Sequence, residues 1–213
     1  MKTALVAGAT GLTGRQLVNL LLRDDRYQVI KVLSRSPLTT QDPRLKNFVV
    51  DFKALQEYAD QLAADDVFCC LGTTMKKAGS KPAFEAVDYE YPLSLAHITK
   101  AQGASQYLLV SALGADKYSS IYYNQVKGRI EEALCTINFN AIHIFRPSLL
   151  LGAREEKRAG EDAAKLFYKL FNFLIPKKYK SIDASKVANA MLHYARTEQS
   201  GIHFHESASL QKF

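Results

Sequence analysis

Three glycines near the start of the chain, Gly8, Gly11 and Gly14 in the run AGATGLTG, have the spacing of a phosphate-binding turn. Glycine can adopt positive φ, and without a Cβ it lets a pyrophosphate come close to the backbone. The run follows the apolar letters ALVA and precedes residues 12–22, whose leucines have helical spacing, so N–H groups there could bind the anion. It therefore predicts a dinucleotide-binding turn, with a plain glycine-rich turn as the alternative. The other residues expected in this turn are Thr10, Leu12 and Thr13.

The end of the second predicted strand indicates which dinucleotide would bind. An acidic residue about twenty positions beyond the glycines usually binds the ribose 2′-hydroxyl of NAD. The chain instead reads Ser34, Arg35 and Ser36 there, with no carboxylate. A guanidinium can pair with a 2′-phosphate and both serines carry hydroxyl donors, so the sequence favours NADP(H). The alternative is that Arg35 is an ordinary surface arginine.

The elements that must position these residues alternate along the chain. Segments with the apolar character of strands are residues 3–7, 28–33, 47–50, 67–71, 107–110, 141–145 and 202–205. Segments with helical character are residues 12–23, 54–62, 83–101, 120–137, 163–174 and 184–195. This alternation predicts an α/β fold, a doubly wound, Rossmann-like parallel sheet in three α/β/α layers. Right-handed crossovers would place the carboxyl ends of the strands at one edge, where ligands bind.

Length and composition limit the class of protein. With 213 residues, 47% of them hydrophobic, the chain suits a single domain over residues 1–213, with residues 153–213 adding a small substrate-side lobe. We find no apolar run near 18 residues and no signal-peptide pattern, so neither a membrane nor export is expected. The net charge of +7 is scattered, which argues against nucleic acid and is compatible with an anionic cofactor. Cys69, Cys70 and Cys135 suit core thiols in a reducing, cytoplasmic compartment.

Four segments together resemble one protein family. They are the G-x-x-G-x-x-G turn, the region from Ser111 to Asp116, the helix around YNQVKG, and the Phe-Arg-Pro segment that ends at Pro147. They are similar to the atypical short-chain dehydrogenase/reductases, in particular the Tat-interacting-protein-type oxidoreductases and their small bacterial relatives. The resemblance covers residues 1–152 firmly and the remainder loosely, and it implies an NADPH-binding fold.

The resemblance also implies a proton-transfer pair, Tyr123 and Lys127, in which the lysine binds the nicotinamide ribose as well. Residues four apart share one face of a helix, and a cation beside a phenol favours the phenolate, which an ordinary pKa near 10 disfavours at neutral pH. Tyr27 and Lys31 have the same spacing, but they flank a strand, where four residues span about 13 Å. The alternative is that Tyr123 faces the core while Lys127 pairs with Glu131 on the surface.

A serine at the end of the fifth strand is the third member of the site that the resemblance implies. Ser111 stands there and would donate a hydrogen bond to the substrate oxygen. Many relatives have two hydroxyl residues in a row at this point, and the second performs the chemistry. Here Ala112 takes that second place, so Ser111 could be no more than a neighbour of the cofactor.

Further cofactor contacts follow from the resemblance. An aspartate at the end of the third strand contacts adenine in such proteins, so Asp51 and Phe52 are expected at that ring, although Asp51 could equally cap the next helix. Pro147 would lie beside the nicotinamide carboxamide and leave backbone groups free for it, with Ser148 in place of the usual glycine.

The end of the fourth strand resembles the family's segment beside the nicotinamide half of the cofactor. Gly72 would let the chain pass close to the ribose, with Leu71 and Thr73 as its neighbours. A plain Gly-Thr turn is the alternative, although the segment lies at the ligand-binding edge of the sheet.

Four histidines have side chains that could bind a metal or take part in catalysis. His203 and His205 alternate on one predicted strand and share a face, but no further ligand accompanies them, so no metal site is predicted. His97 and His143 lie in apolar segments and are expected to be core histidines.

Taken together, these features predict an NADPH-dependent oxidoreductase that reduces a small carbonyl substrate, with residues 166–175 covering the pocket. The alternative is a non-catalytic NADP(H)-binding regulatory or redox-sensing protein that acts through a protein partner. A homodimer is compatible with either function. A sugar-nucleotide epimerase would need a larger substrate domain than the last 60 or so residues provide.

Overall fold

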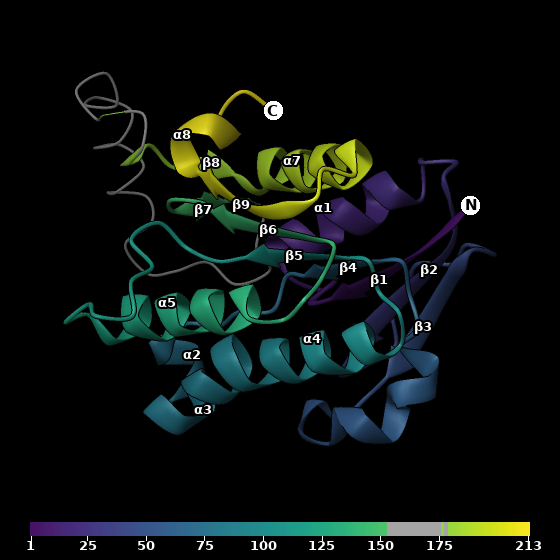
Figure 1. The fold of residues 1–213 in the computed structure, drawn as a ribbon, viewed down its shortest axis with the longest axis horizontal. Helices are drawn as coiled ribbons and strands as arrows, with labels where there is room; N and C mark the ends of the chain where they lie inside the picture. Colours follow the sequence, from purple (N-terminus) through teal and green to yellow (C-terminus); the bar gives the residue numbers. More distant parts are fainter. Residues whose placement is uncertain (153–175, 177–178) are drawn as a thin grey trace.

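A parallel sheet runs through the molecule, whose computed structural model describes residues 1–152, 176 and 179–213 (Figure 1). The strand order is β3-β2-β1-β4-β5-β6-β9, and each neighbouring pair is parallel. The strands are β1 (Lys2–Ala7), β2 (Tyr27–Ser34), β3 (Leu45–Val49), β4 (Asp66–Cys69), β5 (Gln106–Val110), β6 (Ala141–Arg146) and β9 (Gly201–Glu206). A separate two-stranded sheet joins β7 (Leu150–Leu151) to β8 (Ile182–Asp183). All seven predicted strands are confirmed.

Helices cover both faces of the large sheet, as the predicted three-layer α/β/α arrangement requires (Figure 1). One face carries α1 (Leu12–Leu21), α7 (Ala184–Thr197) and the short α8 (Ser207–Leu210). The other carries the 3₁₀ helix η1 (Phe52–Gln61), α2 (Met75–Ala78), α3 (Lys81–Glu85), the π turn η2 (Ala86–Glu90), α4 (Tyr91–Ala101) and α5 (Tyr122–Cys135). No helix in the described ranges is long and apolar enough to cross a membrane.

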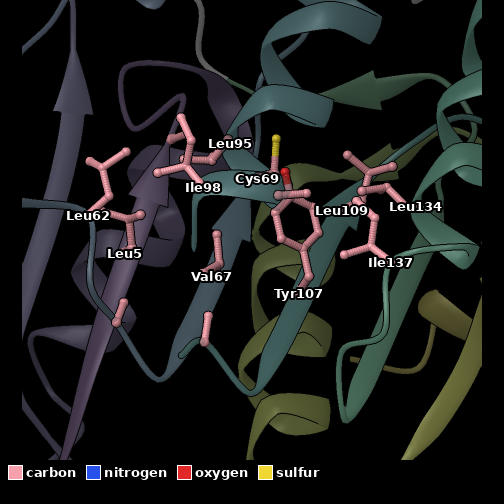
Figure 2. Close-up of a cluster of buried hydrophobic side chains, with 14 of the residues drawn as sticks. Leu5, Leu62, Val67, Cys69, Leu95, Ile98, Tyr107, Leu109, Leu134 and Ile137 are labelled. Atoms are coloured by element: carbon pink, nitrogen blue, oxygen red, sulfur yellow. The ribbon is translucent and has the colours of Figure 1, made fainter. Parts of the chain in front are cut away.

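Two hydrophobic cores form because successive strand residues point to opposite faces of the sheet. In β5, Tyr107 and Leu109 belong to the core under α4 and α5, whereas Leu108 and Val110 belong to the core under α1 and α7. Figure 2 shows part of the first core, in which Leu5 of β1, Val67 and Cys69 of β4 and Tyr107 of β5 lie among its buried side chains, together with Leu95 of α4 and Leu134 of α5. Both faces of the central strands are therefore buried, which explains their continuous apolar runs.

Two predicted helices differ from the observed ones, and a third cannot be compared. The predicted helix 54–62 is the 3₁₀ helix η1, which contains a kink at Ala54. The predicted helix 83–101 is divided into α3, the π turn η2 and α4. Pro92, the second residue of α4, has no N–H to donate to the carbonyl four residues earlier, so the regular hydrogen-bond ladder is interrupted where the π turn meets α4. The predicted helix 163–174 and the pocket cover 166–175 lie outside the described residues.

Asp66 forms a polar cluster at the edge of the sheet opposite the glycine turn. Its buried carboxylate accepts hydrogen bonds from the Tyr27 hydroxyl at 2.6 Å and from the Gln106 amide at 2.9 Å, and Lys2 lies 3.3 Å away. Burial and the nearby carboxylate raise the pKa of Tyr27 well above its ordinary value. Lys31 instead donates to two backbone carbonyls at the end of η1. Tyr27 and Lys31 thus have different hydrogen-bond partners and do not act as a pair, which confirms the prediction from their positions on a strand.

The predicted core histidines have different outcomes. His143 is buried, and its Nδ1 lies 3.0 Å from Nε2 of His205, with the two rings stacked. Burial lowers the pKa of His143 to about 4 and that of His205 to about 3. The prediction for His97 is wrong, because this side chain is exposed on α4 while its neighbours Ala96 and Ile98 occupy the core. In the described part of the chain, no three His, Cys, Asp or Glu side chains are grouped so that they could hold a metal.

Candidate active site

The glycine turn packs so closely on its surroundings that two of its glycines admit no side chain. Gly8 has a φ of +84°, and a Cβ there would lie 2.5 Å from the carbonyl oxygen of Cys70 at the end of β4. A Cβ on Gly14 would lie 2.3 Å from the Gly8 carbonyl oxygen. Real side chains do not approach backbone atoms this closely. The turn is therefore pressed between β4 and α1 at the carboxyl edge of the sheet.

The first turn of α1 has the properties of an anion site. Gly11 is the N-cap residue, and no side chain of the described residues caps the helix there, so the N–H groups of the first turn remain available to a ligand. Thr10 is exposed beside them. The hydroxyl of Thr13 is buried and has no hydrogen-bond partner among the described residues. These features fit a bound pyrophosphate: within the described part of the chain, the helix start is uncapped, the glycines leave the backbone accessible, and the Thr13 hydroxyl lacks a partner. The half-buried Leu12 side chain lies beside Gly152.

At the end of β2, the serines and the arginine have different environments. Ser34 is buried, and its hydroxyl donates to the Ser36 carbonyl at 2.6 Å while it accepts from the Asn47 amide at 2.7 Å. The hydroxyl proton of Ser34 therefore forms a hydrogen bond within the turn and stabilises that turn. Arg35 and Ser36 are both exposed and remain accessible to a ligand.

A hollow of about 320 Å³ lies between α1 and the segment that follows β2. Its lining residues are Ala9, Thr10, Arg15, Val18, Asn19, Pro37, Leu38, Thr39 and Thr40. Arg15, which was not predicted as a site residue, brings a second guanidinium to the region between the glycine turn and the end of β2. Its side chain also donates to the Thr10 carbonyl at 3.5 Å. The available signal was its place directly after the third glycine, where an outward-facing cation lies close to a helix-bound phosphate.

Three residues predicted near the adenine and ribose have structural contacts of their own. Asp51 caps η1 by accepting a hydrogen bond from the Lys53 backbone N–H at 2.9 Å, which was the stated alternative. Phe52 is buried, and its ring packs on Tyr91 with ring centroids 5.7 Å apart. Leu71 is half-buried against the core under α4 and α5. The capping role of Asp51 is established, whereas a contact of these residues with adenine or ribose stays a prediction.

Lys127 lies at the meeting point of α5, η2 and the loop after β4. Its ammonium is 2.8 Å from Oδ1 of Asp88, and the two side chains are 4% and 0% exposed. The other oxygen of Asp88 accepts the backbone N–H of Thr73 at 2.9 Å. Burial acts to lower the pKa of Lys127, but attraction to Asp88 and Tyr123 outweighs it and leaves that pKa above its usual value. Asp88, which the sequence did not single out because it lies in a helical run without a motif, is thus the ion-pair partner of Lys127.

The alternative placement of Lys127 is wrong. Glu131 does not pair with it but forms an ion pair with Arg146, with Nη2 and Oε2 2.5 Å apart. Tyr123 lies one helical turn before Lys127 and is half-buried, with its ring 5.6 Å from that of Phe84. The helix therefore brings the predicted tyrosine and lysine together at the carboxyl edge of the sheet.

Ser111 is buried and its hydroxyl donates to Oε1 of Glu131 at 2.5 Å. Ion pairs with Glu131 and Glu206 raise the pKa of Arg146 above its ordinary value. Ser111, Glu131 and Arg146 thus form one polar network at the ends of β5 and β6. Ala112 is buried beside it and provides no hydroxyl.

Pro147 follows β6 and is buried. Its carbonyl accepts the backbone N–H of Leu113 at 2.8 Å, and the hydroxyl of Ser148 donates to the Lys180 carbonyl. The segment after β6 is therefore tied both to the loop after β5 and to the chain just before β8.

Comparisons with known proteins identify relatives over most of the chain. Residues 8–137 match a family model described as NAD(P)H-binding. Protein HTATIP2 of Rattus norvegicus is 40% identical over 171 residues, which cover 78% of this chain and 70% of that protein. The mitochondrial protein FMP52 of Coccidioides immitis is 31% identical over 210 residues, 89% of this chain and 84% of that protein.

Solved structures with the same fold include several nucleotide-sugar enzymes. MoeE5 in complex with UDP-glucose and NAD has a TM-score of 0.73 at 16% identity, with 95% of this chain and 74% of that chain covered. UDP-glucose 4-epimerase of Thermotoga maritima has a TM-score of 0.72 at 14% identity, with 95% and 76% covered. At these identities the likeness shows the fold alone.

Proposed function

This chain belongs to the NAD(P)H-binding family of atypical short-chain dehydrogenase/reductase-like proteins that includes HTATIP2 and FMP52, and from this premise we propose that it is an NADPH-dependent oxidoreductase. Its substrate would be a small carbonyl compound. The observation that carries the proposal is the buried, charged Lys127, which lies one helical turn from Tyr123 and beside the Gly72–Thr73 loop. A buried ammonium is costly to retain, and clefts that hold such groups are frequent sites of chemistry.

The chain's own groups divide the binding of the dinucleotide among them. The turn at Gly8 and Gly11 and the uncapped start of α1 would hold the pyrophosphate. Arg35, exposed after β2, and Arg15, which lines the hollow beside the glycine turn, would hold the 2′-phosphate, which is the basis for proposing NADPH over NADH. Lys127 would bind the ribose next to the nicotinamide.

The bound dinucleotide would supply a hydride to the carbonyl carbon. The Tyr123 hydroxyl would donate a proton to the carbonyl oxygen, and the positive charge of Lys127 would stabilise the phenolate that this leaves. Ser111 was expected to polarise the same oxygen by donating a hydrogen bond. Because its proton is bonded to Glu131, Ser111 would have to break that contact before it could act as a donor.

That contact favours the second candidate function, a non-catalytic NADP(H)-binding regulator that acts through a protein partner. Ala112 has no hydroxyl, and the hydroxyl of Ser111 is hydrogen-bonded to Glu131. The described part of the site therefore has few hydrogen-bond donors that could stabilise the negative charge that develops on a substrate oxygen. A homodimer suits both functions. We propose a cytoplasmic location for either function, since Cys69, Cys70 and Cys135 are free thiols, which suit a reducing compartment.

The deciding experiment measures NADPH binding and turnover across a broad panel of aldehydes and ketones. Tyr123→Phe should lower kcat by about 10²- to 10⁴-fold while NADPH still binds. Tyr122→Phe is the matched control, because the neighbouring hydroxyl bonds to Glu85 at 3.0 Å, and it should leave turnover within a few-fold. Tight NADPH binding without turnover, unaffected by Tyr123→Phe, would reject the enzyme and favour the regulator. The dinucleotide that copurifies, identified by mass, tests the cofactor independently.

A further inference from the structure

The Asp88 carboxylate contacts two parts of the candidate site at once. One oxygen lies 2.8 Å from the Lys127 ammonium on α5, and the other accepts the N–H of Thr73 in the loop after β4. A Cβ on Gly72 would lie 3.5 Å from Asp88 Oδ1 and 3.8 Å from Lys127 Nζ. Lysine, carboxylate and loop backbone therefore converge at one point.

The backbone that carries Asp88 is irregular at this point. The residue lies in the π turn η2, between α3 and α4, and is fully enclosed. Single π turns inside helices are rare and are frequent at functional sites. The widened turn is thus the element that supports a carboxylate between α5 and β4.

The charges around Lys127 show what Asp88 contributes. The groups that act on the ammonium are Asp88 from η2, Tyr123 from its own helix and the buried thiol of Cys69 from β4. The nearest carboxylate on α5, Glu131, is bonded to Arg146 instead. Of these described neighbours, Asp88 supplies the countercharge, and an ammonium this deeply buried is strongly disfavoured without one.

We propose that Asp88 is a positioning residue that keeps the Lys127 ammonium charged and directed at the cofactor side of Tyr123, and that anchors the Gly72–Thr73 backbone to the same point. The reasoning rests on the proposed function for what Lys127 does. The state of Lys127 in the ligand-free protein can be measured without that assumption. Asp88 acts through Lys127 and the loop and does not itself touch substrate.

The test replaces Asp88 with asparagine and follows Lys127 by NMR in ¹³C-lysine-labelled protein, with its resonance assigned from Lys127→Arg. In the wild type Lys127 should stay charged up to pH 10. In Asp88→Asn, burial is no longer opposed, so its titration should fall by at least about two pH units, a hundredfold change in the proton equilibrium. Asp24→Asn is the control, because it removes a different buried carboxylate, paired with Arg26 and Arg196 at the opposite edge of the sheet, and should leave Lys127 unchanged.

A second readout is the affinity for NADPH between pH 7.5 and 9.5. In Asp88→Asn the Kd should rise by about tenfold over this range as Lys127 loses its proton, whereas the wild type and Asp24→Asn should change little. A Lys127 titration that is the same in Asp88→Asn and wild type would overturn the inference, whatever the binding data show. Failure of the wild type to bind NADPH would instead count against the proposed function. If Asp88→Asn does not fold, the wild-type titration decides: a Lys127 that loses its proton below pH 10 would overturn the inference.

Discussion

The hydroxyl of Ser111 donates its proton to the carboxylate of Glu131, with Oγ and Oε1 2.5 Å apart and both side chains buried. Glu131 is in turn held by Arg146, so the serine belongs to a charged network that joins α5 to β6. A hydroxyl has a single proton to donate. Ser111 is therefore better placed to support the end of β5 than to polarise a substrate.

Ser111→Ala should accordingly change turnover by no more than about fivefold. It should lower the free energy of unfolding by about 1 to 3 kcal/mol, because a buried hydrogen bond to a charged group is lost. Steady-state kinetics and urea unfolding measure the two effects, with Tyr123→Phe as the reference for loss of a proton donor. A hundredfold fall in kcat at unchanged stability would restore Ser111 to the catalytic role that the resemblance implies.

Arg35→Ala and Arg15→Ala should weaken NADPH binding far more than NADH binding. Each removes a guanidinium proposed to pair with the 2′-phosphate, a charge-assisted contact worth about 1.5 to 3 kcal/mol, or about 10- to 100-fold in Kd. Fluorescence titration with both dinucleotides gives the ratio. Arg23→Ala, an exposed arginine just beyond α1, should affect neither. Equal losses for the two dinucleotides would remove the assignment of NADPH.

Gly8→Ala and Gly79→Ala form a matched pair that separates backbone conformation from packing. Both glycines have a positive φ, +84° and +78°, but a Cβ at Gly79 meets nothing within 4 Å, whereas at Gly8 it would lie 2.5 Å from a backbone oxygen. Gly79→Ala should cost about 1 to 2 kcal/mol of stability. Gly8→Ala should cost several kcal/mol more and abolish dinucleotide binding. Equal melting temperatures for the two variants would contradict the close packing of the turn.

The buried histidine pair should make stability depend on pH below neutrality. His143 and His205 have a pKa of about 4 and about 3 in the folded protein against about 6.5 when unfolded, so the unfolded state binds more protons. Their contribution is complete above pH 6.5 and is lost as pH falls toward 4, by about 2 kcal/mol per histidine between pH 7 and 5.

His143→Gln should reduce this pH dependence by about 2 kcal/mol over the same interval in urea unfolding. His97→Gln is the control, because that side chain is exposed on α4, and it should leave the slope unchanged. A variant at His143 with the wild-type slope would show that the pair is not the source.

Much of the fold and part of the candidate site could be predicted from local patterns. The seven strands follow from short apolar runs, and the glycine turn from its spacing and its place between a strand and a helix. The pairing of Tyr123 with Lys127 follows from the geometry of a helix, since residues four apart share a face. These features depend on residues that are close together in the sequence, so they could be predicted without the tertiary structure.

The partners of the charged side chains were decided by the tertiary structure. Lys127 is bonded to Asp88 rather than to Glu131 because η2 packs against α5 and its π turn brings the carboxylate inward. The sequence shows that Ser34 and Ser111 have hydroxyl donors, but in the folded protein both hydroxyls donate to other groups of the protein. Which polar groups remain for a ligand depends on how distant elements fill the space around them, and no local spacing encodes that.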